Sequence, residues 1–434
     1  MKYSMRNTPS TQLFSLLKWS EKYFKTDMFY LLRTGFWGNA GVATSSLFGL
    51  VLYVIFGHFL SPEEYGMYQY LLTLSVFINA LTLTGMNTAV TRSVARGYSG
   101  SLYAAVRYQL LLGLIPFVFG VGFSIYFAIS GNFAISIGVL IMSIAIPLVN
   151  SFNTYAAFLT GKLDVRRAFL YNFAGNVPYY AGIGLSAVYF KEALPILFVN
   201  MVLGTIVSYV AYKRTLKRVD NIAASEPGVT RYGTHLSLMN IPLIILGSLD
   251  NLLAFHFLGA AGLAIYSFST AIPDQVGKLM KFLPAAALPK FSLNESASFG
   301  ISLKRKIIQV FCVSLFLTIA YFLLAPYIFT YLFPKYTEAI PYSKLYALII
   351  LSLGTGLVTT ALMAKERLRE LYIFNISSGV IQTVLQLIGI FFWGLTGLIV
   401  GKVVSSQIAL FISIFLFFKR KSIPSINLPS EEKV

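Results

Sequence analysis

The sequence predicts an all-α polytopic membrane protein with about twelve transmembrane helices, arranged as two six-helix lobes. The first observation behind this prediction is composition. Of the 434 residues, 56% are hydrophobic and 12% are charged, and the mean hydropathy is +0.72. A soluble domain of this length could not bury so much apolar surface. The second observation is an alternating placement of basic residues along the chain, and the third is an internal repeat.

Apolar segments long enough to cross a bilayer follow one another along the chain. The preceding segment, 1–35, is basic and lacks an uninterrupted apolar core with a small-residue cleavage site, so no cleavable signal peptide is expected. Its alternating apolar and basic residues predict either an amphipathic helix on the cytoplasmic membrane surface or a disordered basic tail. We expect the spans at 36–59, 65–86, 108–128, 133–157, 168–190, 193–213, 236–258, 262–284, 306–333, 341–363, 371–393 and 395–418.

Basic residues mark alternate connections between these segments, as the positive-inside rule describes. Thirty of the 34 lysines and arginines fall in 1–35, in every second connection, or after the last span. The opposite connections hold only Lys191, Lys335 and Lys344, and Lys402 lies inside the last span. We therefore expect a multi-pass protein of the cytoplasmic (inner) membrane with both termini in the cytoplasm. The net charge of +18 then reflects topology, and no nucleic-acid partner is expected.

The two halves of the chain repeat at an offset of 198 residues. His58-Phe59-Leu60 recurs as His256-Phe257-Leu258, and the same offset relates Arg107 to Arg305. Six spans separate the copies, so they share one orientation, which indicates a parallel repeat and two similar lobes. The predicted organisation is an N-lobe at 36–213, a cytoplasmic linker at 214–235, a C-lobe at 236–418 and a cytoplasmic tail at 419–434.

Two acids lie inside the long apolar stretch that opens the second half. A charge at that depth costs at least ~2.5–3.5 kcal/mol on insertion scales, so such a group usually faces a cavity, an ion or a partner. Asp250 is followed by Asn251 and has no basic neighbour, which favours a proton or sodium site or a polar cavity wall. Asp274 has Lys278 four residues later, so a structural ion pair on one helix face is an equally good interpretation.

Basic residues near the inward ends of the spans are candidates for binding an anionic head group. Arg92 and Arg96 are four residues apart and would share one helix face, and Lys278 and Lys281 occupy the corresponding region of the second half. They could form an inward vestibule that captures a phosphate-bearing lipid, although topology alone also accounts for them. Lys402 lies too deep to reach the surface easily, so it could meet an anionic substrate or neutralise an acid.

Signatures of enzymes and metal sites are missing from the sequence. There is no phosphate-binding Gly-Lys-Ser/Thr loop, no zinc motif and no long outward loop to hold a catalytic site. The three histidines are too few for a multi-His metal site, and the one cysteine, Cys312, excludes a disulfide framework. We expect a transporter that uses no cofactor and no metal.

Several short motifs point to a known family. Residues 56–97 contain a Leu-x-Pro-Glu-Glu-Tyr-Gly-x-Tyr turn followed by a glycine and two spaced arginines. The matching residues are Leu60, Pro62, Glu63, Glu64, Tyr65, Gly66, Tyr68, Gly85, Arg92 and Arg96. Further matches are Asp250 with Phe257-Leu258-Gly259, the late turn 332–336 with Pro334 in place of the usual glycine, and the Trp-Gly-Leu-Thr-Gly of 393–397. Together these motifs resemble the Wzx-like polysaccharide repeat-unit flippases of the multidrug/oligosaccharidyl-lipid/polysaccharide exporter superfamily.

This resemblance implies a fold and a function. The two lobes would surround a central cavity that opens alternately to each side of the membrane. The substrate would be an undecaprenyl-diphosphate-linked oligosaccharide, moved from the inner to the outer leaflet for O-antigen, capsule or exopolysaccharide synthesis. The implied partners are this lipid-linked oligosaccharide, membrane lipids, H⁺ or Na⁺ as a coupling ion, and the polysaccharide polymerase or chain-length machinery. Of the candidate site residues, the resemblance supports Asp250, Arg92 and Arg96.

Three other functions remain open from the sequence. A cation-coupled multidrug exporter of the same fold would use acids in the cavity to bind cationic drugs. A membrane polysaccharide polymerase or ligase would need a long outward loop, which the chain lacks. A peptidoglycan-precursor flippase would be expected to have more spans and stronger central arginines.

Overall fold

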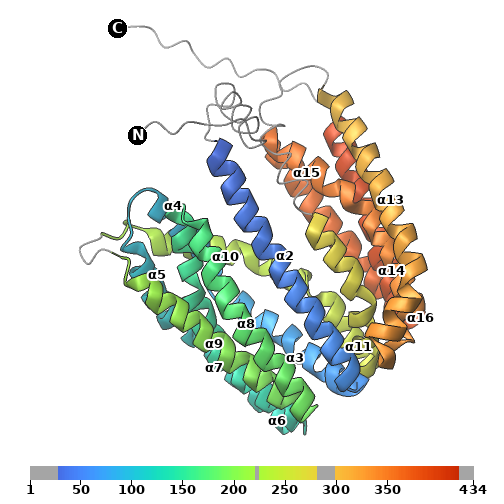
Figure 1. Cartoon of the computed structure of the whole chain (residues 1–434), viewed down its shortest axis with the longest axis horizontal. Helices are drawn as coiled ribbons and strands as arrows, with labels where there is room; N and C mark the ends of the chain where they lie inside the picture. Colours follow the sequence, from blue (N-terminus) through green and yellow to red (C-terminus); the bar gives the residue numbers. More distant parts are fainter. Residues whose placement is uncertain (1–27, 220–223, 281–298, 420–434) are drawn as a thin grey trace, which may run out of the picture. The chain divides into compact units, whose positions relative to one another are not determined.

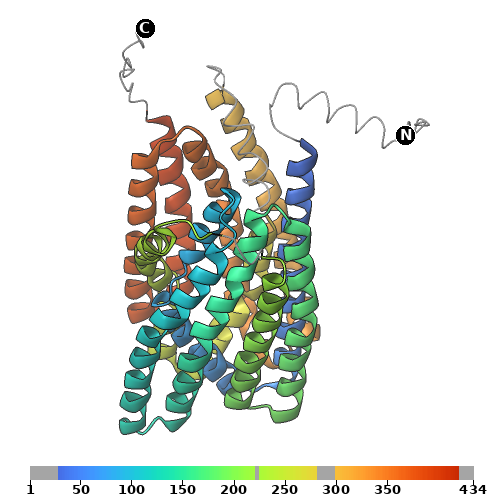
Figure 2. The same ribbon diagram turned by 90° about the vertical axis from the view of Figure 1, so that its left-hand side faces the viewer.

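The protein is helical throughout the part of the chain that the computed structural model describes, residues 28–219, 224–280 and 299–419 (Figures 1 and 2). No β-strand occurs in these ranges, and the predicted fold class is confirmed. Residues 1–27 of the segment 1–35, which was expected to be an amphipathic helix or a basic tail, and the tail after residue 419 lie outside the described residues. The first helices are α2 (Met28–Phe59), α3 (Pro62–Ala80), α4 (Met86–Ala95), α5 (Ser101–Leu112), α6 (Leu114–Ile129), α7 (Phe133–Gly161), α8 (Val165–Phe190) and α9 (Ala193–Leu216). They are followed by α10 (Val229–Leu246), α11 (Leu249–Met280), α13 (Phe299–Leu332), η1 (Pro334–Tyr336), α14 (Ala339–Ala347), η2 (Leu348–Leu353), α15 (Gly354–Ala364) and α16 (Leu368–Phe418).

Eight stretches of the described residues are long and apolar enough to cross a membrane. Two of them, Val229–Met280 and Leu368–Phe418, are longer than one crossing needs, and each contains a glycine in a left-handed conformation. Gly259 (φ 71°) and Gly394 (φ 55°) lie where the sequence places a connection between consecutive spans. The chain is thus a multi-pass membrane protein, and the number twelve stays a prediction.

Some predicted spans are not single α-helices in the structure. The span 108–128 is divided at Gly113, and 341–363 contains the 3-10 helix η2. The segment 236–258 was expected to be a single helix, but α10 ends at Leu246 and α11 begins at Leu249. Gly247 and Ser248 form a turn between them. Glycine is among the poorest helix formers, and a hydropathy average over the whole segment does not detect a two-residue break.

The described helices form two compact units. The first comprises Met1–Leu279 with Pro326–Ile340, and the second Met280–Ala325 with Pro341–Val434. In the first unit, α7 packs against α5, α6 and α9, and these helices lie side by side in teal and green in Figures 1 and 2. Also in this unit, α2 packs against α8, and α10 packs against α3, α4 and α5. In the second unit, α15 and η2 pack against α16. The lobe boundaries expected from the repeat stay a prediction.

The Leu-x-Pro-Glu-Glu-Tyr-Gly motif forms the start of α3. Ser61 caps the helix by accepting a hydrogen bond from the Glu64 amide, and Pro62 occupies the first turn, where its missing N–H costs nothing. Glu64 Oε2 in turn accepts a 2.7 Å hydrogen bond from the Ala193 amide at the start of α9. Tyr65 is fully buried against Phe268, with ring centroids 4.7 Å apart. The motif therefore builds a packed corner within the first unit.

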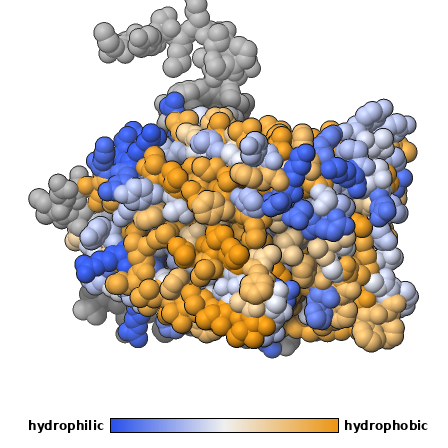
Figure 3. Space-filling model, turned by 90° about the horizontal axis from the view of Figure 1, so that it is seen from below, coloured by the Kyte–Doolittle hydropathy of each residue, from blue (hydrophilic) through white to orange (hydrophobic). Residues whose placement is uncertain are grey.

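Large apolar side chains cover much of the surface. Figure 3 shows orange, hydrophobic residues over most of one face, and many exposed residues of the described helices are Leu, Ile, Val and Phe. Such a surface is suited to contact with lipid tails rather than with water.

Candidate functional site

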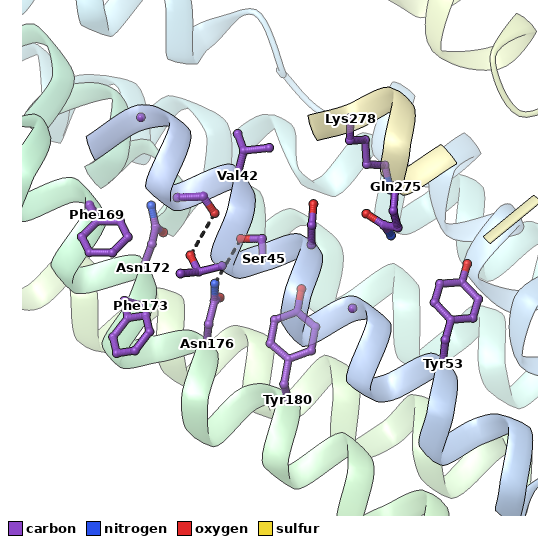
Figure 4. Close-up of a pocket in the computed structure, with 15 residues that line it drawn as sticks. Val42, Ser45, Tyr53, Phe169, Asn172, Phe173, Asn176, Tyr180, Gln275 and Lys278 are labelled. Carbon is purple, nitrogen blue, oxygen red and sulfur yellow. Dashed lines mark hydrogen bonds between the residues drawn. The ribbon is translucent and has the colours of Figure 1, made fainter. Parts of the chain in front are cut away.

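A cavity of about 680 Å³ lies in the first unit, between α2, α8 and the end of α11 (Figure 4). This volume falls within the roughly 300–1,000 Å³ range of small-molecule sites. Its lining mixes hydroxyl, amide and aromatic side chains with a single cationic side chain. The lining residues are Gly38, Gly41, Val42, Thr44, Ser45, Ser46, Gly49, Tyr53, Phe169, Asn172, Phe173, Asn176, Tyr180, Gln275 and Lys278.

The α2 wall is made of small residues. A Cβ atom added at Gly38 would meet nothing within 4 Å, and one added at Gly41 would meet only Phe169, at 3.8 Å. At Gly49 the nearest atom would be the Gln275 Nε2, at 3.9 Å. Because these glycines have no side chain, the α2 face leaves open much of the space that forms the cavity. Thr44 satisfies its hydroxyl locally, by donating to the Ala40 carbonyl at 2.8 Å.

The α8 wall presents two amides and several rings. Asn172 and Asn176 are four residues apart, so they lie one above the other on the same helix face. Figure 4 shows both side chains directed toward α2, and Asn176 Nδ2 donates to Ser45 Oγ at 3.4 Å. The rings of Phe169 and Phe173, with centroids 5.9 Å apart, lie beside them.

The α11 wall supplies the remaining polar groups. Gln275 is 7% exposed, and its Oε1 atom is buried without a hydrogen-bond partner in the described part of the chain. Lys278, one turn further along, is exposed and belongs to none of the ion pairs between described residues. Figure 4 shows both side chains projecting toward the cavity. A buried acceptor and an unpaired ammonium group are thus available to a ligand.

Of the site residues predicted from the sequence, only Lys278 lines this cavity. Asp250 is 5% exposed, and its carboxylate accepts hydrogen bonds from the Tyr266 hydroxyl (2.8 Å) and the Asn251 amide (3.0 Å). Asp274 is partly exposed and interacts electrostatically with Tyr53, a lining residue. In the second unit, Lys402 Nζ lies 5.8 Å from the centre of the Tyr346 ring. Lys281 lies outside the described residues.

Arg92 and Arg96 take part in a different arrangement, here called the arginine clasp, which consists of Arg92, Arg96, Glu226 and Tyr232. Arg96 Nη1 lies 2.9 Å from Glu226 Oε1, and Arg92 Nη2 lies 3.8 Å from the same oxygen. The Arg92 guanidinium also lies 4.5 Å from the centre of the Tyr232 ring. Arg92 lies in the last turn of α4, and Arg96 is the C-cap of that helix. The clasp joins α4 to the segment that leads into α10.

Close backbone packing accompanies the clasp. The Gly85 amide donates to Ser237 Oγ at 2.9 Å, and a Cβ at Gly85 would lie 2.5 Å from the Ser237 nitrogen. A Cβ at Gly233 would likewise lie 2.6 Å from the sulfur of Met86. Two glycines therefore permit α10 to approach the start of α4 closely.

The clasp is expected to depend on the charge of Glu226. Burial acts to raise the pKa of this carboxyl, but hydrogen bonds from Ser93 and Arg96 and the charges of Arg96 and Arg92 outweigh it and lower the pKa below 4.5. Because the pKa of Glu226 is lower in the folded chain than in the unfolded chain, its ion pairs stabilise the fold fully above pH 4.5. This stabilisation is lost as the pH falls through the pKa of the folded state. The arginine side chains are 42% and 53% exposed, so solvent keeps the contribution small.

We expect Glu226→Gln to speed hydrogen–deuterium exchange in 224–237 at neutral pH about twofold to fivefold, the range of an exposed ion pair. Glu192→Gln, a matched change at an exposed glutamate on α9's N-cap, should leave that segment unchanged. The double variant Arg96→Glu/Glu226→Arg should restore slow exchange. Equal exchange in the wild type and Glu226→Gln would show that the clasp does not hold this segment.

Several residues that line the cavity were not predicted from the sequence. The spans were identified by their apolar content, and this measure does not single out uncharged amides such as Asn172, Asn176 and Gln275. The four-residue spacing of the two asparagines was a usable signal, because it places both amides on one face of a helix. No group of three or more His, Cys, Asp or Glu residues able to hold a metal occurs among the described residues.

Solved transporter structures share this fold. A multidrug resistance transporter of the MATE family and MOP superfamily, in its inward-facing conformation, matches with a TM-score of 0.65 and 15% identity, over 86% of this chain and 93% of that one. A MATE protein in the straight conformation matches with a TM-score of 0.59 and 15% identity, over 89% of this chain and 94% of that one. An outward-facing MATE transporter of the MOP superfamily matches with a TM-score of 0.57 and 17% identity, over the same shares of the two chains. At such low identity the likeness shows the fold alone. None of the curated proteins matches the chain.

The chain thus has a MATE-like fold. A family model described as "Polysaccharide biosynthesis protein" matches residues 31–295, more than half of the chain. The chain belongs to this family of polysaccharide biosynthesis proteins, and its resemblance to the Wzx-like flippases is confirmed.

Proposed function

We propose that the protein is a flippase that moves a polyprenyl-diphosphate-linked oligosaccharide from the inner to the outer leaflet of the cytoplasmic membrane. The single observation that carries the proposal is the cavity, in which Lys278 stands beside a set of uncharged amides and hydroxyls and has no ion-pair partner among the described residues. An ammonium group can make charge-assisted hydrogen bonds to a phosphate. The amides and hydroxyls suit the sugar portion, which carries many donors and acceptors of its own.

The location of Lys278 supports the proposed direction. Under the topology predicted from the basic residues, Lys278 lies at the inward end of its span, where a newly made lipid-linked oligosaccharide would arrive. The lipid tail would stay in the bilayer while the diphosphate and the nearest sugars enter the cavity. Alternating access would then expose the cavity to the outer side. Delivery there to a polysaccharide polymerase or to chain-length machinery belongs to the same proposal.

Export of cationic drugs is the second candidate, since two of the structures that share the fold are multidrug resistance transporters. A site for cations is expected to contain a carboxylate. Among the described residues that line the cavity there is no Asp or Glu, and the one charged lining residue is basic. Asp274 lies near Tyr53 but does not line the cavity. The charge of the cavity therefore favours an anionic substrate.

Reconstitution tests the proposal directly. The purified protein is placed in liposomes that contain a polyprenyl-diphosphate-linked oligosaccharide with a radiolabelled sugar, and its exposure to an external glycosidase is followed with time. We expect the protein to speed the appearance of label outside, compared with empty liposomes. No acceleration, together with efflux of a cationic dye such as ethidium, would reject the flippase in favour of the exporter.

An ion gradient is proposed to act through Asp250. A buried ionisable group in a span is a candidate ion carrier, and one charge that crosses 100 mV contributes about 2.3 kcal/mol. We expect Asp250→Asn to abolish the acceleration caused by an imposed H⁺ or Na⁺ gradient and to leave gradient-free exchange in place. Tyr266→Phe removes the hydrogen bond to Asp250 but keeps the carboxylate, so it should retain a gradient response. Asp274→Asn tests the second candidate, and a full gradient response in Asp250→Asn would exclude Asp250.

A further inference from the structure

The orientation of the Asn172 amide is fixed by a hydrogen bond from a residue outside the cavity, Tyr155. The Oδ1 atom of Asn172 accepts a 2.6 Å hydrogen bond from the hydroxyl of Tyr155 on α7. Because the oxygen is engaged there, the NH₂ group of Asn172 remains to donate toward the cavity. Tyr155 is 2% exposed, so this support is firmly packed. Asn172 therefore offers a fixed donor.

The amides on either side of the cavity offer acceptors. Asn176 uses Nδ2 to donate to Ser45, so its Oδ1 atom remains available. Across the cavity, Gln275 Oε1 is buried and lacks a partner among the described residues. A buried acceptor without a donor is unfavourable, and a hydroxyl group of a ligand would satisfy it. The α8 and α11 walls thus present donors and acceptors to the same space.

Aromatic rings lie next to these amides. Phe169 and Phe173 line the cavity and stack on each other, while Tyr180, also a lining residue, stacks on Phe48 with centroids 5.2 Å apart. A pyranose ring has hydroxyls around its edge and an apolar face of C–H bonds. Amides that meet the edge and rings that meet the face make a combination suited to a sugar. The described residues that line the cavity include no Asp or Glu that would repel a phosphate held nearby.

We propose that this cavity binds the sugar that is attached directly to the diphosphate. In this arrangement Asn172, Asn176 and Gln275 pair with its hydroxyls while Lys278 holds the phosphate. The inference rests on the proposed function, since it assigns the parts of that substrate to particular side chains. It makes the three amides determinants of which sugar is accepted, whereas Lys278 contributes equally to every substrate.

The test separates the sugar from the diphosphate. The probes are farnesyl diphosphate and farnesyl diphosphate that carries glucose, galactose, N-acetylglucosamine or N-acetylgalactosamine. The dissociation constant of each is measured by calorimetry with the full-length protein in nanodiscs. We define the sugar gain as the dissociation constant of farnesyl diphosphate divided by the dissociation constant of a glycosylated probe, so that it measures how much the sugar strengthens binding. We expect a gain of at least tenfold for one sugar in the wild type.

Matched variants test which side chains produce the sugar gain. Asn172→Leu/Asn176→Leu should remove it and leave the farnesyl diphosphate constant within twofold of wild type. The milder pair Asn172→Ala/Asn176→Ala serves the same purpose if the leucines impair folding. Lys278→Gln should weaken all probes alike and keep the gain, and Asn87→Leu, at an exposed asparagine of α4 outside the cavity, should change neither quantity.

Each outcome decides one question. Wild-type protein that binds farnesyl diphosphate but shows no gain with any of the four sugars overturns the sugar subsite and leaves the flippase proposal standing. Asparagine variants that lose affinity for farnesyl diphosphate as strongly as for the glycosylated probes also overturn it, because the residues would then be structural. Wild-type protein that binds none of the probes overturns the proposed function itself.

Discussion

Lys278→Glu is expected to abolish transport of a diphosphate-linked substrate. Lys278 is the only charged residue among the described residues that line the cavity, and the change replaces its attraction for phosphate by repulsion. A hydrogen bond to a charged group is worth about 1.5–3 kcal/mol, so even neutral Lys278→Gln should lower the transport rate at limiting substrate about 10- to 150-fold. The measurement is label translocation in liposomes, with Lys278→Arg expected to retain most activity.

Lys217→Glu provides the matched control for this reversal. Lys217 is an exposed lysine at the end of α9, in another basic connection and outside the cavity. The same charge change there alters the topology signal to the same degree but should leave the transport rate within about twofold, as expected of an exposed surface residue. If both variants lose activity equally, the effect of Lys278 is one of membrane insertion rather than of substrate binding.

Gly66→Val is expected to remove most of the folded protein. A Cβ atom at Gly66 would lie 1.8 Å from the carbonyl oxygen of Ala260, a backbone atom that cannot rotate away. Overpacking of this kind costs about 1–3 kcal/mol and sometimes more. The variant should give a large loss of the monodisperse peak in fluorescence-detected size-exclusion chromatography and a lower melting temperature.

Gly122→Val controls for helix propensity. Gly122 lies in α6, is exposed, and has nothing within 4 Å of an added Cβ. The same substitution there should preserve both the peak and the melting temperature. A Gly66→Val protein as stable as Gly122→Val would show that α3 and α11 do not approach each other as closely as the structure places them.

Hydropathy identified most of the helices, because it is an average over many residues. The same averaging missed the break at Gly247–Ser248, which involves two residues in a long apolar run. The motif around Tyr65 was visible as a family resemblance, but its physical role was not. That role depends on Ala193 and Phe268, which are far away in the sequence and meet it only in the folded chain.

The candidate site was predicted less completely than the fold. Basic residues near the ends of apolar segments stand out in the sequence, and Lys278 was found for that reason. Arg92 and Arg96 stood out equally, yet they contact Glu226, a partner that no spacing rule connects to them. Asn172 and Gln275 carry no charge and come from different helices, so only the packing of α2, α8 and α11 brings them together.

The glycine-lined wall of α2 has a consequence for how this transporter could diversify. Because open space surrounds the place of a Cβ at Gly38, and contact at Gly41 is ordinary, single substitutions there would narrow the cavity without disturbing the packing of the helix. Cavity size can then vary independently of stability. Descendants of one sequence could therefore adapt to substrates of different bulk through a few mutations on one helix face.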